Sequence, residues 1–384
     1  MIENYRRALG LPPAGTETFF LWGPRQAGKS TLLHDAYPEA LWIDLLKTDE
    51  YRRFMQNPEL LREEIGYNKA SFVVIDEIQK VPALLNEVHW LRENRAVHFA
   101  LCGSSARKIR KGKANLLGGR GINYELYGFS AYELGKDFEL DRMLNNGYLP
   151  VFYSAARPER IQSSYVSGYL KDEIAAEGLV RNLPGYSRFL NMAALSDAGM
   201  VNYSTIARDT GVSSQTIRGY FEILEDTLLG RFLPAYRYRP KRRIAVASKF
   251  YFHDAGIVNF LARRGRLTAG SELYGKAFEN WVFHELYTYN MYRERYAELF
   301  FWHLATGTEV DFIVNHIDCA IECKATQKVH SDHLKGLRQL GIEHPEVKRR
   351  IIVSLDQKNR RTEDGIDIVD YQEFLRLLWE GELF

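Results

Sequence analysis

The clearest motif in the chain is a strand, a glycine-containing loop and a helix start in residues 19–33, Phe19-Phe20-Leu21-Trp22-Gly23-Pro24-Arg25-Gln26-Ala27-Gly28-Lys29-Ser30-Thr31-Leu32-Leu33. An apolar run ends at Gly23, and Gly28, Lys29 and Ser30 follow after four intervening residues. This spacing is typical of a phosphate-binding loop, in which backbone N–H groups and the positive end of the next helix face phosphate oxygens. Lys29 would supply a cation for the β- and γ-phosphates, and Ser30 a hydroxyl for Mg²⁺. Residues 23–31 are therefore predicted to bind a nucleotide.

The composition is that of an ordinary folded protein with room for two or three domains. The 384 residues are 46% hydrophobic and 26% charged, with a formal net charge of +2. Because the chain is nearly neutral, any affinity for nucleic acid must come from local basic patches.

Three observations bear on the compartment. The start of the chain lacks the apolar core of a signal peptide, and no apolar run reaches the roughly 18 residues of a membrane span. The cysteines show no C-x-x-C spacing, which argues against a disulfide framework or a zinc site: Cys102, Cys319 and Cys323. We therefore expect a cytoplasmic protein with no membrane partner.

Short apolar runs alternate with helical patterns over residues 18–126, which predicts a parallel α/β sheet. Strands are expected at residues 18–22, 41–44, 72–75 and 97–102. The third expected strand is followed directly by Asp76 and Glu77, so two acids lie at the carboxyl end of a buried strand. There Asp76 would hold Mg²⁺, and Glu77 would orient and polarise the attacking water. Two acids in a solvated loop are the alternative, but the phosphate-binding loop favours the functional interpretation.

Two further segments could reach the same edge of the sheet. The fourth expected strand ends at Ser104 and Ser105, where a hydroxyl could sense the γ-phosphate or position the water. The alternative is an N-cap for a helix that begins near Ala106, and both interpretations stay open. Arg120 follows two glycines and is a candidate arginine finger or phosphate sensor, with a solvated side chain as the alternative.

These motifs resemble those of a known family. Four segments are similar to AAA-type ATPases of archaea and bacteria that carry a C-terminal domain related to restriction endonucleases: residues 23–31, Ile75-Asp76-Glu77-Ile78-Gln79, Gly103-Ser104-Ser105 and Leu117-Gly118-Gly119-Arg120. The resemblance implies a P-loop NTPase core of AAA type at residues 1–128, binding ATP and Mg²⁺, and a helical lid region at residues 129–196. It also strengthens the assignment of Arg120. A finger supplied by a neighbouring chain would require a homo-oligomer, whereas Arg120 could equally act within its own chain.

Residues 197–250 are predicted to form a winged helix-turn-helix. Ser204 would cap a short helix through Thr210, and Gly211 would make the turn. Ser213 or Ser214 would then cap a longer helix through Glu225, in the position of a helix that reads the DNA major groove.

The charges of this region point in two directions. Acids outnumber Arg218 on the second helix and would repel DNA phosphates: Glu222, Glu225 and Asp226. A run of cations with tyrosines between them follows and could form a DNA-contacting wing: Arg237, Arg239, Lys241, Arg242, Arg243 and Lys249. A solvated hairpin or an interdomain contact is the alternative.

Residues 251–384 carry a second catalytic pattern. Asp311 is followed, after ten intervening residues, by Glu322-Cys323-Lys324, which resembles the PD-(D/E)xK motif of restriction-endonuclease-like nucleases. A tight turn about His316 and Ile317 would pair residues whose numbers sum to 633. Asp311 would then face Glu322 and Glu309 would face Lys324, so that these four side chains would share one face.

Two carboxylates opposite each other repel, and a bound divalent ion would relieve the repulsion. Asp311 and Glu322 suit Mg²⁺ or Mn²⁺, and Lys324 could hold a scissile phosphate. The resemblance adds Glu279 as an accessory metal-binding acid. A surface hairpin whose acids are neutralised by Lys324 is the alternative.

Two hypotheses follow. In the first, the N-terminal domain binds and hydrolyses ATP and controls a metal-dependent nuclease domain that acts on DNA. In the second, the C-terminal domain is a non-catalytic binding module, and ATP switches a scaffold between states. The sequence identifies no protein partner.

Overall fold

The structure is a computed structural model, and it describes residues 5–105, 107, 121–173, 180, 182–237 and 247–384. The chain divides into two units. The N-terminal unit comprises Leu9–Gly128 and Glu222–Leu229, and the C-terminal unit comprises Met1–Ala8, Phe129–Phe221 and Gly230–Phe384. No helix among the described residues is long and apolar enough to cross a membrane.

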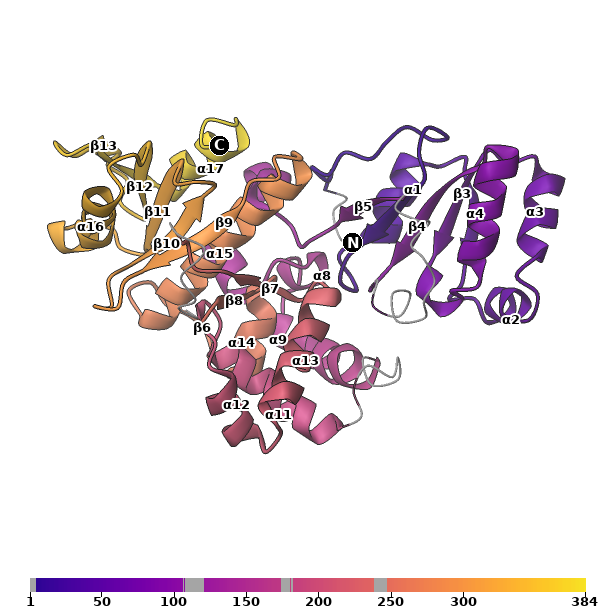
Figure 1. The fold of residues 1–384 in the computed structure, drawn as a ribbon, viewed down its shortest axis with the longest axis horizontal. Coiled ribbons are helices and arrows are strands. Elements are labelled where there is room, and N and C mark those ends of the chain that lie inside the picture. Colours follow the sequence, from indigo (N-terminus) through magenta and orange to yellow (C-terminus); the bar gives the residue numbers. More distant parts are fainter. Residues whose placement is uncertain (1–4, 106, 108–120, 174–179, 181, 238–246) are drawn as a thin grey trace. The chain divides into compact units, whose positions relative to one another are not determined.

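The N-terminal unit is built on a parallel sheet of five strands (Figure 1). Their order is β2 (Leu41–Asp44), β3 (Phe72–Asp76), β4 (His98–Gly103), β1 (Phe19–Trp22) and β5 (Ile122–Glu125). The four strands predicted from their apolar runs are confirmed, and β5 is an additional edge strand. In a parallel sheet of this kind, ligands bind at the carboxyl ends of the strands.

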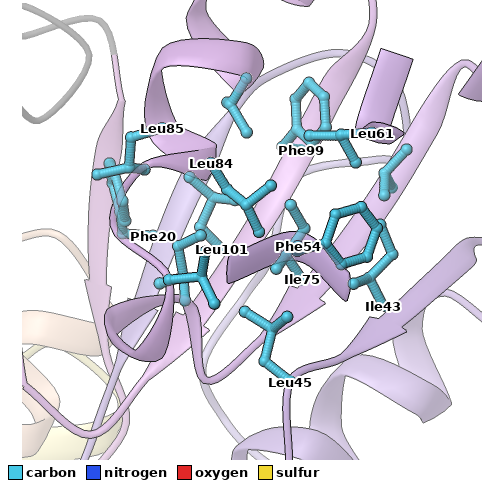
Figure 2. Close-up of a cluster of buried hydrophobic side chains, with 14 of the residues drawn as sticks. Phe20, Ile43, Leu45, Phe54, Leu61, Ile75, Leu84, Leu85, Phe99 and Leu101 are labelled. Atoms are coloured by element: carbon cyan, nitrogen blue, oxygen red, sulfur yellow. The ribbon is translucent and has the colours of Figure 1, made fainter. Parts of the chain in front are cut away.

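Helices cover this sheet and share a continuous core with it. They are α1 (Lys29–Ala36), α2 (Thr48–Gln56), α3 (Leu60–Asn68) and α4 (Leu84–Arg95), with a short 3₁₀-helix η1 (Ile78–Lys80). Figure 2 shows Phe54 of α2 and Leu84 of α4 packed over the strand residue Ile75. Leu228, from the separate segment Glu222–Leu229, belongs to the same core.

The C-terminal unit begins with helices, as predicted for the region after residue 129. They are α6 (Ala131–Leu134), η3 (Gly135–Asp137), α7 (Leu140–Asn146), α8 (Pro150–Tyr153), α9 (Pro158–Ser164), η4 (Tyr165–Glu173) and α11 (Leu183–Leu195). Among them, η4 is a π-helix. The carboxylate of Asp254 accepts hydrogen bonds from the backbone N–H groups of Tyr148 and Leu149, at 2.7 Å each, and thereby fixes the chain between α7 and α8.

The predicted helix-turn-helix consists of α12 (Tyr203–Thr210) and α13 (Ser214–Asp226), joined at Gly211 with φ 70°. Ser213 caps α13, because its Oγ accepts from the N–H of Thr216 at 3.1 Å. The prediction that Ser204 caps the first helix is wrong: Asn202 does so, and its Oδ1 accepts from the N–H of Thr205 at 3.0 Å.

A three-stranded antiparallel sheet accompanies these helices, in the order β6 (Gly199–Met200), β8 (Lys249–Phe252) and β7 (Gly230–Leu233). The helix α14 (Ala255–Leu261) follows β8. Because side chains alternate along a strand, Phe250 faces one side of β8 and Tyr251 the other. Phe250 packs on Phe221 of α13 and Phe232 of β7, with ring centroids 4.8 and 5.0 Å away.

A second, mixed sheet forms the end of the C-terminal unit. Its order is β13 (Arg360–Arg361), β14 (Ile366–Asp370), β12 (Arg349–Ser354), β11 (Cys319–Lys324), β10 (Glu309–Val314) and β9 (Leu299–His303). The accompanying helices are α15 (Glu272–Tyr292), η5 (Ser331–Leu334), α16 (Lys335–Glu343) and α17 (Tyr371–Trp379).

The hairpin of β10 and β11 has the predicted register. The pairs are Phe312 with Ile321, Ile313 with Ala320, and Val314 with Cys319, and each pair of numbers sums to 633. Against β9, however, the register of β10 shifts between Val310 and Ile313. This shift is a local irregularity beside Asp311, and the carboxylates of Glu309 and Asp311 both lie within 3.7 Å of Nζ of Lys249.

Candidate functional site

The phosphate-binding loop lies between β1 and α1, and its backbone has the required shape. Gln26 (φ 63°) and Gly28 (φ 95°) adopt left-handed conformations, which turn successive N–H groups towards one point. A Cβ on Gly23 would lie 2.5 Å from the carbonyl oxygen of Leu126, so only glycine fits there. Lys29 is 7% exposed, and its Nζ donates to the carbonyl oxygens of Gly23 (2.7 Å) and Pro24 (3.0 Å).

The candidate magnesium ligands lie next to each other. The Oγ of Ser30 donates to Oδ2 of Asp76 at 2.7 Å, and Oδ1 of Asp76 accepts from the N–H of Glu77 at 2.9 Å. A hydroxyl and a carboxylate in contact offer the oxygen ligands that Mg²⁺ prefers, so these residues fit the expected Mg²⁺–nucleotide complex. Thr31, the last residue of the predicted loop, is exposed at the start of α1.

The carboxylate of Glu77 is held by a buried amide. Gln79, at 2% exposure, donates through Nε2 to Oε2 of Glu77 and to Oγ of Ser104, the latter at 3.1 Å. A Cβ on residue 103 would lie 2.3 Å from Oε1 of Gln79, which explains the glycine at that position. Ser104 is thus linked to Glu77, the residue after β3, through the side chain of Gln79.

Ser105 and the acids of α13 have structural partners. The Oγ of Ser105 accepts from the N–H of Arg107 at 3.1 Å, in keeping with the capping interpretation. Arg107 pairs with Asp226 at 2.5 Å and with Glu222 at 3.8 Å, so these two acids are engaged within the N-terminal unit. Ala106 and Arg120 lie outside the described residues, and Arg120 remains a prediction.

In the C-terminal unit, the predicted acidic residues come together around a lysine that the prediction did not include. Lys249 of β8 is 3% exposed. Its Nζ lies 3.1 Å from Oε1 of Glu279 on α15, 3.5 Å from Oδ1 of Asp311 and 3.7 Å from Oε1 of Glu309. Tyr251, two residues further along β8, donates to the same Oε1 of Glu279 at 2.6 Å.

The remaining residues of the acidic site are partly paired. Oδ2 of Asp311 accepts from the N–H of Cys323 at 2.8 Å, and Oε1 of Glu322 lies 2.5 Å from Nζ of Lys324. Oε2 of Glu322 is buried and has no hydrogen-bond partner among the described residues.

Burial and mutual repulsion disfavour ionisation of these acids. Burial, reinforced by the Asp311 carboxylate, raises the pKa of Glu322 to about 8 and the pKa of Glu279 to about 7. Burial alone would lower the pKa of Lys249, but the carboxylates of Glu279, Asp311 and Glu309 outweigh it and raise that pKa above its usual value.

A divalent ion does not fit this arrangement. Within the described part of the chain, no three His, Cys, Asp or Glu side chains are arranged to hold a metal ion. Where the sequence led us to expect a cation between Glu279, Asp311 and Glu322, the ammonium group of Lys249 contacts two of these three acids. Lys249 therefore does not belong to a DNA-contacting wing. Of the other cations in that run, Arg237 is exposed, and Arg239, Lys241, Arg242 and Arg243 lie outside the described residues.

Comparison with known proteins identifies the N-terminal unit. Residues 16–135 match the family described as an AAA domain, and this segment contains the phosphate-binding loop and the acids Asp76 and Glu77 at the end of β3. These residues form an AAA-type ATPase domain. The rest of the chain matches two domains of unknown function, DUF8612 over residues 137–268 and DUF4143 over residues 274–374.

The similarity to individual proteins is lower. An uncharacterized protein of Haemophilus influenzae is 25% identical over 247 residues, which are 59% of this chain and 60% of that protein. The chain thus matches less than two thirds of that relative.

Two solved structures are also similar. One is a replication initiator DnaA bound to AMPPCP and single-stranded DNA, with 13% identity, a TM-score of 0.29, and coverage of 55% of this chain and 83% of that one. The other is the Aeropyrum pernix Orc1 protein in complex with DNA, with 12% identity, a TM-score of 0.24, and coverage of 65% and 87%. TM-scores this low support no argument about this chain.

Two functional candidates were missed by the sequence analysis. Gln79 of the AAA-type domain lies only two residues after Glu77, but its contact with Ser104 joins residues 25 positions apart. Lys249 was assigned to a basic run, although its acidic partners Glu279 and Asp311 lie 30 and 62 positions away. Both residues can be found only when the strands are paired in space.

Proposed function

We propose that the protein is an ATPase whose AAA-type domain hydrolyses ATP and thereby switches the state of a regulator or scaffold. The observation that carries this proposal is the convergence of Lys29, Ser30 and Asp76 with Glu77 at the carboxyl edge of one parallel sheet. These are the residue types that phosphoryl transfer needs: a cation, oxygen ligands for Mg²⁺ and a carboxylate base.

Each residue has a distinct part in this mechanism. On ATP binding, Lys29 would exchange the carbonyl oxygens of Gly23 and Pro24 for phosphate oxygens, and Ser30 and Asp76 would hold Mg²⁺. When bound, Mg²⁺ neutralises charge on the phosphates. Glu77 accepts a proton from the attacking water, and Gln79 holds its carboxylate in place from the side of Ser104.

For the C-terminal unit, the proposal favours a non-catalytic binding module over a nuclease. The supporting observation is the ammonium group of Lys249 between Glu279 and Asp311. We derive no hydrolytic step from Asp311, Glu322 and Lys324, because the site does not fit the divalent ion that such a step requires. DNA binding through the basic segment after Leu233, and assembly into a homo-oligomer with Arg120 as a finger, remain parts of the proposal to be tested.

The test is ATP hydrolysis by the full chain in the presence of Mg²⁺. Lys29→Ala should abolish hydrolysis and weaken ATP binding, whereas Glu77→Gln should abolish hydrolysis and retain ATP binding. Absence of hydrolysis by the wild type, or full activity of Lys29→Ala, would refute the proposal. Incubation of the same samples with DNA and Mn²⁺ tests the nuclease alternative, which requires cleavage that Asp311→Ala and Lys324→Ala both remove.

A further inference from the structure

The acidic site of the C-terminal unit has a cation of its own. The ammonium of Lys249 lies within 3.7 Å of the carboxylates of Glu279, Glu309 and Asp311. It also lies 5.6 Å from the ring centroid of Phe301, on β9 of the mixed sheet. With acids and an aromatic ring around it and 3% exposure, Lys249 is enclosed in the site rather than resting on its surface.

The backbone of Lys249 is held in place by strand pairing. Lys249 begins β8, where it pairs with Leu233 of β7 and Met200 of β6. Tyr251, on the same face of β8, donates to the Glu279 oxygen that also contacts Lys249. Two donors from one strand thus converge on one carboxylate.

This arrangement competes with a metal ion. Mg²⁺ binds oxygen ligands at about 2.0–2.1 Å, and a bound Mg²⁺ would supply positive charge to balance these carboxylates. An ammonium in hydrogen-bond contact with Glu279 and Asp311 supplies that charge from within the chain, and a divalent ion beside it would be repelled. A buried carboxylate is costly unless a cation or a proton balances its charge, and Lys249 supplies a cation to Glu279 and Asp311.

We propose that Lys249 is the built-in counter-ion of this site and takes the place of a divalent metal. The inference rests on the proposed function of the C-terminal unit as a non-catalytic module and gives its physical cause. The acidic residues at this site therefore stabilise the junction of β8, α15 and β10 and do not activate water.

The experiment is a Mn²⁺ titration of the nucleotide-free full chain, followed by electron paramagnetic resonance. The wild type should show no Mn²⁺ site that depends on Asp311. Lys249→Met, which keeps the length of the side chain and removes its charge, should gain one Mn²⁺ site whose affinity is at least about tenfold higher than any Mn²⁺ binding of the wild type at these acids. The additional site should disappear in Lys249→Met/Asp311→Asn. Lys276→Met, which removes an exposed lysine of α15 paired with Glu272, is the matched control and should behave as the wild type.

Two results would overturn the proposal: a wild-type Mn²⁺ site that Asp311→Asn removes, or a folded Lys249→Met without any gain in Mn²⁺ binding. If Lys249→Met does not fold, Lys249→Met/Glu279→Gln reduces the acidic charge, and recovery of folding by this variant supports the counter-ion role. If that variant also fails to fold, the Mn²⁺ titrations of the wild type and of Asp311→Asn test the proposal, which a Mn²⁺ site lost in Asp311→Asn would refute. Since the AAA-type domain is unchanged in every sample, its ATP hydrolysis is measured in parallel, and failure of the ATPase proposal is recognised separately.

Discussion

Replacing Gln79 by leucine tests whether the amide positions Glu77, the proposed catalytic base. Leucine preserves most of the buried volume beside Gly103 but cannot donate to Glu77 or Ser104. A hydrogen bond to a charged group contributes about 1.5–3 kcal/mol. If that free energy is needed to keep Glu77 in place in the transition state, kcat should fall by about 10- to 100-fold.

The assay is steady-state ATP hydrolysis, combined with calorimetric ATP binding and thermal unfolding of the same preparation. Because Gln79 contacts Glu77 and Ser104 but not Lys29 or Ser30, the KM and the affinity for ATP should stay close to the wild-type values. Gln339→Leu is a matched control, since Gln339 is a half-buried glutamine outside the AAA-type domain that donates to the carboxylate of Glu343. An unchanged kcat, or a weakened ATP affinity with kcat retained, would refute the positioning role.

Three further predictions concern stability. Burial raises the pKa of Glu285 from 4.5 to about 8, so between these pH values the folded protein holds a proton that the unfolded protein releases. As the pH rises through this range, up to about 5 kcal/mol of the free energy of unfolding should be lost. Glu285→Gln should flatten the pH dependence of Tm. Gly147 has a φ of 107°, and Gly147→Ala would place a Cβ 2.4 Å from Oδ1 of Asp254. This variant should lose more than about 2 kcal/mol of the free energy of unfolding, measured with denaturant. Gly275→Ala is the control, because its Cβ would meet no atom within 4 Å and should not destabilise the fold. Asn202→Ala should cost about 1 kcal/mol by the same measurement, and Ser204→Ala much less, because Asn202 makes the cap.

The sheet of the AAA-type domain could be predicted because its central strands are buried on both faces. Residues of β1 and β3 are all buried, and continuous apolar runs of this kind stand out in a sequence. The edge strand β5 was missed because its residues, Ile122-Asn123-Tyr124-Glu125, are partly exposed and include two polar side chains. Its place in the sheet is fixed by pairing with β1, which no local pattern reveals.

The acidic site was predictable in its members but not in its chemistry. The hairpin register followed from the length of the turn, so the neighbourhood of Asp311 and Glu322 could be worked out from residue spacing alone. The register shift beside Asp311 and the arrival of Lys249 could not, because both depend on strands outside the hairpin. The charge balance of this buried site includes Lys249, which lies outside the motif of Asp311, Glu322 and Lys324 and therefore could not be predicted from that motif.

The strand β8 connects two features that the sequence assigned to separate domains. A boundary was expected between residues 250 and 251, but both lie within this four-residue strand. Phe250 packs into the aromatic core of the helix-turn-helix, and Lys249 and Tyr251, on the opposite face, bind Glu279. The packing of Phe250 on Phe221 and the ion pairs of Lys249 therefore both depend on the position of this one strand.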